Sequence, residues 1–80
     1  MTKKLIVVGA SWCGACKGLT AALKNHNIEF EYMDGDTDEG MTFCQYHKVR
    51  SLPTSFIIED TEIVKVVIGN KVGEIIGGLE

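Results

Sequence analysis

The stretch GASWCGACKG, at residues 9–18, contains two cysteines, Cys13 and Cys16, separated by two small residues. It follows the apolar run LIVV at residues 5–8, which shows no alternation of polar and apolar positions and is typical of a strand buried on both faces. A Cys-x-x-Cys pair can bind a metal, close a structural disulfide, or cycle between dithiol and disulfide. The surrounding sequence decides between these three uses.

Composition limits the class of protein. The chain has 80 residues, 45% of them hydrophobic, which predicts one packed domain over residues 1–80. A net charge of -3 argues against binding to nucleic acid or to an anionic membrane, and no apolar run is long enough to cross a bilayer. The apolar run near the start is too short for a secretory signal, so we expect a cytoplasmic monomer. Three cysteines in a reducing compartment make a lasting structural disulfide the least favoured use of the pair.

Seven elements are predicted along the chain, in the order βαβαββα. The strands are expected at residues 4–8, 28–33, 54–58 and 63–68, and the helices after the turn at 11–13, at about 38–48 and at 70–79. A strand-helix-strand crossover makes the first two strands parallel, and the last two form an antiparallel hairpin. The predicted fold class is α/β, with a four-stranded mixed sheet and helices on both faces.

This order places the cysteine pair at the carboxyl end of the first strand and the N-terminus of the first helix. Backbone N–H groups and the helix dipole stabilise a thiolate at that position, so Cys13 is expected to be the nucleophile. Cys16, one turn further along, is expected to resolve the mixed disulfide. Trp12 either covers one side of the site or is a partly buried aromatic residue with no role in reactivity.

Two motifs resemble the thioredoxin family. Trp12-Cys13-Gly14-Ala15-Cys16-Lys17 is similar to the active-site motif WCGPCK, and the block DTDE at residues 36–39 followed by VRSLPT at 49–54 is similar to the family's DxDE and VRSIPT segments. The resemblance covers nearly the whole chain. It implies a minimal thioredoxin-like fold and a protein-disulfide oxidoreductase.

The resemblance also implies site residues and partners. The proline of the second motif is cis in the family and lies against the cysteines, which implies a cis Leu52–Pro53 bond here. Substrate would be held by residues around this proline and the cysteine pair, namely Trp12, Leu52, Pro53, Thr54 and Gly69. No bound cofactor is implied beyond the Cys13–Cys16 disulfide. Clients would be disulfide-containing proteins, ribonucleotide reductase among them, and electrons would come from a thioredoxin reductase or from glutathione.

The chain departs from the family pattern at several positions. It begins at the strand that precedes the cysteines, an architecture shared with glutaredoxins, and Ala15 replaces the family's proline. Val7 stands where thioredoxins have a buried aspartate that moves protons for the second cysteine. Asp34 is a weak candidate to replace it and is better explained as a turn residue. A glutathione-dependent glutaredoxin is therefore an alternative, in which Arg50 would hold a glutathione carboxylate.

Two alternatives from other classes also stand. Cys13, Cys16, Cys44 and His47 form a C-x2-C…C-x2-H set, four ligands of the kinds that bind structural zinc. Zinc would occupy both thiolates of the pair and leave the Pro53 motif unexplained, so no metal is expected. The other alternative is a binding module without redox turnover, which is disfavoured because both cysteines are present.

Overall fold

The strand that precedes the cysteine pair lies inside the sheet. In the computed structural model, which describes residues 3–80, the sheet order is β2-β1-β3-β4, with β1 parallel to β2 and antiparallel to β3. β3 and β4 form an antiparallel hairpin. The elements are β1 (Lys3–Gly9), α1 (Gly14–Asn25), β2 (Glu31–Asp34), α2 (Asp38–His47), β3 (Thr54–Glu59), β4 (Glu62–Ile68) and α3 (Val72–Leu79). The predicted order βαβαββα and the mixed four-stranded sheet are confirmed.

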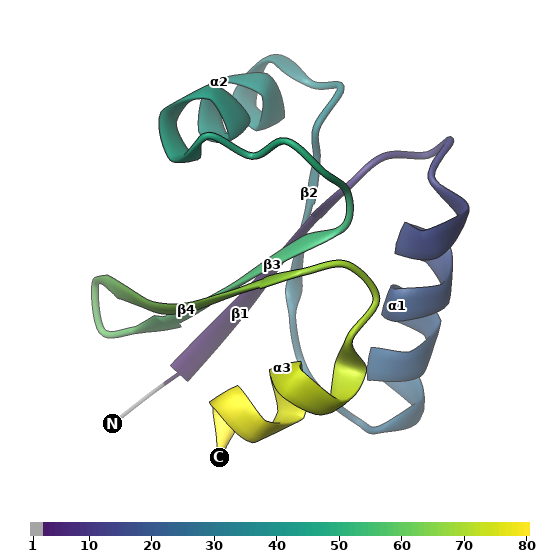
Figure 1. Cartoon of the computed structure of the whole chain (residues 1–80), viewed down its shortest axis with the longest axis vertical. Helices are drawn as coiled ribbons and strands as arrows, with labels where there is room; N and C mark the ends of the chain where they lie inside the picture. Colours follow the sequence, from purple (N-terminus) through teal and green to yellow (C-terminus); the bar gives the residue numbers. More distant parts are fainter. Residues whose placement is uncertain (1–2) are drawn as a thin grey trace.

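The unbroken apolar run of β1 supplies both faces of the sheet. Leu5 and Val7 point into one core, which α1 and α3 cover, and Ile6 and Val8 point into a second core, which α2 covers. Figure 1 shows α1 and α3 on one side of the sheet and α2 on the other. Residues 5–8 alternate between two buried cores, so a strand with no polar position is what this fold requires.

The second strand is shorter than its sequence pattern predicts. Alternation begins at Ile28, but β2 begins at Glu31, and its register with β1 runs from Ile6 opposite Glu31 to Gly9 opposite Asp34. The backbone N–H of Ile28 donates to the Leu23 carbonyl at 3.0 Å, directly after Asn27 in a left-handed conformation (φ 57°). Residue 28 therefore completes the end of α1, and its side chain packs on the core without strand pairing.

The second helix is fixed by its first turn. The Thr37 hydroxyl caps it by accepting from the Gly40 N–H at 3.0 Å, and Asp38 and Glu39 lie near the positive end of its dipole. A Cβ at Gly40 would overlap the carbonyl oxygen of Asp34, so α2 lies backbone to backbone against the end of β2. Across residues 3–80, no helix combines the length and the apolar character needed to cross a membrane.

Candidate active site

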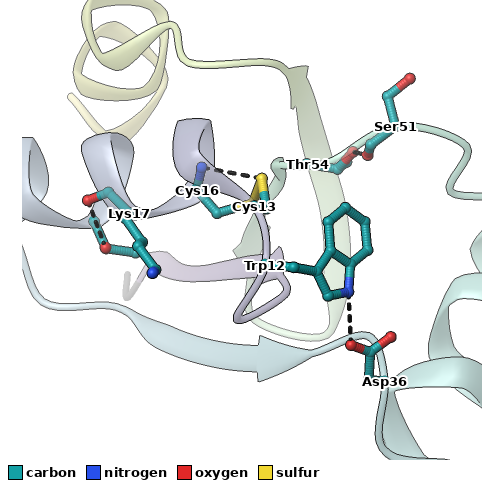
Figure 2. The surroundings of a disulfide bond; sticks show 8 residues. Trp12, Cys13, Cys16, Lys17, Asp36, Ser51 and Thr54 are labelled. Atoms are coloured by element: carbon teal, nitrogen blue, oxygen red, sulfur yellow. Dashed lines mark hydrogen bonds between the residues drawn. A yellow bond between two sulfur atoms is a disulfide. The ribbon is translucent and has the colours of Figure 1, made fainter.

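The cysteine pair lies between β1 and α1. Cys13 is the N-cap of α1, and its Sγ accepts a hydrogen bond from the backbone N–H of Cys16 at 3.1 Å (Figure 2). The two residues form a disulfide, with Cα atoms 5.3 Å apart. A side chain at an N-cap normally satisfies one of the free N–H groups of the first turn, and here sulfur takes that place.

The two sulfur-bearing residues differ in exposure. Cys13 retains 8% of its surface, whereas Cys16 retains 1%. Both belong to a small cluster with Ala10, against which Leu52 packs. An incoming group can therefore reach Cys13, whereas Cys16 faces the protein interior.

Trp12 lies at the exposed edge of the site, and its role in covering one side of the cysteine pair stays a prediction. It is 70% exposed, and its Nε1–H donates to Asp36 Oδ2 at 2.8 Å (Figure 2). Asp36 lies in the loop between β2 and α2, so this hydrogen bond joins that loop to the loop before α1. The sequence motif included Asp36, but only the fold brings it to Trp12.

The loop before β3 forms the other wall of the site. The Leu52–Pro53 peptide bond is cis, as the resemblance implied. Pro53 and Thr54 are buried, and the Thr54 hydroxyl donates to the Ser51 carbonyl at 2.6 Å (Figure 2). The Gly69 N–H donates to the Pro53 carbonyl at 2.8 Å, in a left-handed conformation (φ 92°) that favours glycine. Of the five residues expected to hold substrate, Thr54 and Gly69 thus hydrogen-bond within this wall, and Leu52 contacts the cysteine cluster.

Comparison with known proteins identifies the family. The thioredoxin family model matches residues 1–79. The chain belongs to the thioredoxin family. Thioredoxin H3 of Arabidopsis thaliana is 33% identical over 84 residues, which cover 99% of this chain and 71% of that protein. With the Cys13–Cys16 disulfide, this membership makes the chain a thiol-disulfide oxidoreductase of the protein-disulfide type.

Solved structures of thioredoxins share the fold. Oxidized mitochondrial thioredoxin 3 of Saccharomyces cerevisiae has a TM-score of 0.77 and 26% identity, over 96% of this chain and 76% of that one. A chain in the crystal structure of a complex between ferredoxin:thioredoxin reductase and thioredoxin f2 has a TM-score of 0.82 and 21% identity, over 96% of this chain and 74% of that one. The similarity to thioredoxins in both sequence and fold does not favour the glutaredoxin alternative.

The four residues of the zinc alternative are not brought together. Cys44 and His47 lie on α2. Cys44 packs against the core that contains Ile6 and Phe56, and the centroid of the His47 ring lies 5.3 Å from that of the Phe56 ring. Within residues 3–80, no three His, Cys, Asp or Glu side chains are grouped so that they could hold a metal ion. Burial raises the pKa of the Cys44 thiol, which disfavours the thiolate that zinc requires.

The proton-transfer carboxylate of other thioredoxin-family members has no counterpart at Val7, which is fully buried among apolar side chains. Asp34 is the last residue of β2, and its Oδ1 accepts from the Asp36 N–H at 2.9 Å in the turn that follows. No sequence motif pointed to Tyr32, whose hydroxyl lies close to Cys16. Only the parallel pairing of β1 with β2 reveals this proximity.

Proposed function

We propose that this thioredoxin-family chain reduces disulfides in client proteins, with Cys13 as nucleophile and Cys16 as resolving cysteine. The observation that supports these roles is the position of Cys13 as the N-cap of α1, with the Cys16 N–H directed at its Sγ. A thiolate there faces a backbone donor and the positive end of a 12-residue helix whose first turn carries no acid. Both features favour the charged, attacking form of the sulfur.

The cycle transfers two electrons from the protein to the client. The Cys13 thiolate attacks one sulfur of the client disulfide, and the other client sulfur leaves as a thiolate and takes up a proton. Cys16 loses its proton, and its thiolate attacks Cys13 Sγ. The Cys13–client bond breaks, the second client sulfur leaves and is protonated, and the Cys13–Cys16 disulfide forms. The client becomes a dithiol, and the protein reaches the oxidised state that the structure holds.

A client strand would lie along the rim of the site. Trp12 and Ile68 are exposed there, at 70% and 58%, and Leu52 is half-buried beside the cysteines. A peptide in extended conformation can hydrogen-bond to the backbone of the loop at residues 51–53 while its disulfide approaches Cys13. In this proposal Pro53, Thr54 and Gly69 hold the loop in shape, because their carbonyl, hydroxyl and N–H groups are bonded within the wall.

We further propose that the protein works as a cytoplasmic monomer of one domain and receives electrons from a thioredoxin reductase. Support for the reductase comes from the fold neighbour in complex with ferredoxin:thioredoxin reductase, and a neighbour also occurs in a structure of a peroxiredoxin resolved via glutathione and thioredoxin systems. Reduced client thiols persist in the cytoplasm. Ribonucleotide reductase is a candidate client, because it is a common client of the small members of the family that this chain resembles.

Insulin reduction tests the proposal. The protein is assayed in parallel with NADPH and a thioredoxin reductase, and with glutathione and its reductase. We expect turnover with the first system, complete loss in Cys13→Ser, and a trapped client-linked disulfide in Cys16→Ser. The control Cys44→Ser should retain full activity, since Cys44 lies on α2, away from the pair. Turnover in the Cys13→Ser variant would overturn the assigned roles, and turnover with glutathione alone would reassign the reductant.

A further inference from the structure

Gly9, the last residue of β1, lies at a point where two reactive groups approach each other. A Cβ built on Gly9 would lie 2.9 Å from the Tyr32 hydroxyl oxygen and 3.0 Å from Cys16 Sγ. The Tyr32 hydroxyl oxygen and Cys16 Sγ both lie within 3.0 Å of this Cβ position, so the distance between the two atoms is at most twice 3.0 Å. The absence of a side chain at Gly9 leaves the space that the tyrosine ring and the sulfur occupy.

Cys16 and Tyr32 also share an open groove. It has a volume of about 1080 Å³ and runs between α1 and β2, and its lining includes Cys16 and Tyr32 together with Ala10, Ser11 and Asp34. Cys13 is not among the residues that line it. Cys16 keeps only 1% of its surface, so the groove borders the disulfide on the Cys16 side without opening it to an incoming group.

We propose that the Tyr32 hydroxyl donates a hydrogen bond to the Cys16 thiolate each time that thiolate forms, and so supplies the polar partner that Val7 does not. The inference rests on the proposed function, because Cys16 becomes a thiolate only if it resolves the mixed disulfide or leaves when a reductase opens the Cys13–Cys16 bond. The hydroxyl and the sulfur both border the empty Cβ position of Gly9, so no side chain at that position separates them.

A tyrosine at this place is suited to donate and not to accept a proton. Burial raises the pKa of Tyr32, and the carboxylates of Asp34 and Asp36 raise it further, so the phenol stays neutral across the range in which thiols ionise. In this proposal the tyrosine keeps its own proton, and the proton that Cys16 loses passes to solvent. A hydrogen bond from a neutral donor to a thiolate is charge-assisted and stabilises the charged form.

Other charges face the same space. Lys17 of α1 favours the Cys16 thiolate and is exposed, whereas Asp34 of β2 opposes it. Asp36, in the loop after β2, does not line the groove and acts on Tyr32 by raising its pKa. Further along the groove, Lys4 of β1 and Glu31 of β2 form an ion pair at 3.0 Å. The groove therefore carries charges of both signs. Removing the neutral Tyr32 hydroxyl changes what lies beside Cys16 Sγ without changing the net charge of the groove.

The test measures the ionisation of Cys16 in a Cys13→Ser, Cys44→Ser background, where it is the only thiol of the three cysteines. Thiolate absorbance at 240 nm is followed against pH with and without Tyr32→Phe. We expect this change to raise the titration midpoint by about one unit, so that the thiolate fraction at pH 7 falls about tenfold. The matched control Tyr46→Phe removes the hydroxyl of an 81% exposed ring on α2 and should leave the midpoint unchanged. Equal midpoints with and without the Tyr32 hydroxyl, or an equal shift in the control, would overturn the proposal.

A second measurement covers the case in which Tyr32→Phe does not fold. In a Tyr46→Phe version of the same background Tyr32 is the only tyrosine, so a ¹³Cζ label reports on it alone. Its resonance should shift with the midpoint of the Cys16 titration, and a resonance that moves only when the phenol itself ionises would refute the hydrogen bond. Either negative result, together with normal insulin reduction by the unmodified protein, would remove the role of Tyr32 and leave the proposed function intact.

Discussion

The indole Nε1 of Trp12 donates a hydrogen bond to Asp36 Oδ2 over 2.8 Å, which joins the active-site loop to the loop between β2 and α2, 24 residues further along the chain. The contact is exposed, so it contributes little to global stability. Its effect is local: it holds a large aromatic ring at the rim where a client would bind.

Removing this contact should free the indole. We expect Asp36→Ala to lower the free energy of unfolding by less than about 1 kcal/mol, and to increase the mobility of Trp12 and the KM for insulin. Because Trp12 is the only tryptophan, fluorescence anisotropy measures its motion directly. Asp38→Ala, which alters an acid in the first turn of α2, is the control and should leave the anisotropy unchanged. An indole equally rigid without the Asp36 carboxylate would contradict this account of the rim.

The three thiols of the reduced protein should react in a fixed order. We expect iodoacetamide at pH 6 to alkylate Cys13 first, since it is the more exposed of the pair and caps α1. Cys44 should lag, because burial raises the pKa of its thiol and keeps it protonated. Peptide mapping by mass spectrometry gives the order. Faster labelling of Cys16 or Cys44 than of Cys13 would assign the nucleophile to another residue.

The N-cap of α2 should make a measurable contribution to the free energy of unfolding. Thr37→Ala removes the hydroxyl that accepts from the Gly40 N–H, and N-cap losses of this kind cost about 0.5–2 kcal/mol. Thr42→Ala is the matched control, because its hydroxyl only donates to the Asp38 carbonyl within the same helix. Urea denaturation compares the two. An equal loss in both variants would mean that the Thr37 hydroxyl does not act as a cap.

Stability should fall at alkaline pH. The pKa values of Cys44 and Tyr32 are raised in the folded protein above their ordinary values of 9.0 and 10.0. The folded state then holds these protons more tightly than the unfolded state does. Their contribution to the free energy of unfolding is therefore fully present below pH 9 and is lost as the pH rises through the pKa values of the folded state. Urea denaturation of the reduced protein between pH 7 and pH 11 should show this loss, with an earlier component that is absent in Cys44→Ala. A free energy of unfolding that stays constant over this range would refute both shifts.

Chelation should leave the fold unchanged. Cys44 and His47 lie on α2, and Cys13 and Cys16 lie at the start of α1, so they do not form one ligand set. We expect the reduced protein to contain no stoichiometric zinc by atomic emission and to have the same melting temperature with and without EDTA. Unfolding on chelation would restore the zinc alternative.

The local features of the chain were predictable from its sequence, because hydrophobic periodicity and turn residues determine them. The order of elements and the position of Cys13 at a helix start both follow from patterns within about ten residues. The start of β2 was predicted too early, since the alternation of Ile28 and Phe30 reflects burial against α1 and not strand pairing.

Contacts between segments that lie far apart in the chain could not be predicted from the sequence. The partner of Trp12 is Asp36, and the neighbour of Cys16 is Tyr32, and neither follows from spacing along the chain. Both depend on the register of β1 with β2, which sets Val7 opposite Tyr32 and Gly9 opposite Asp34. A slip of one residue would turn Tyr32 to the other face of the sheet and remove it from the groove.

The contact between Gly40 and the Asp34 carbonyl also restricts how this lineage can diverge. Any side chain at position 40 would force α2 away from the sheet, whereas Cβ atoms at Gly73 and Gly77 would meet no described atom within 4 Å. A saturation library sorted for folded protein should therefore return glycine almost alone at position 40 and a wide range of residues at positions 73 and 77. Sequences that descend from this chain would therefore keep glycine at position 40, although Gly40 takes no part in the chemistry.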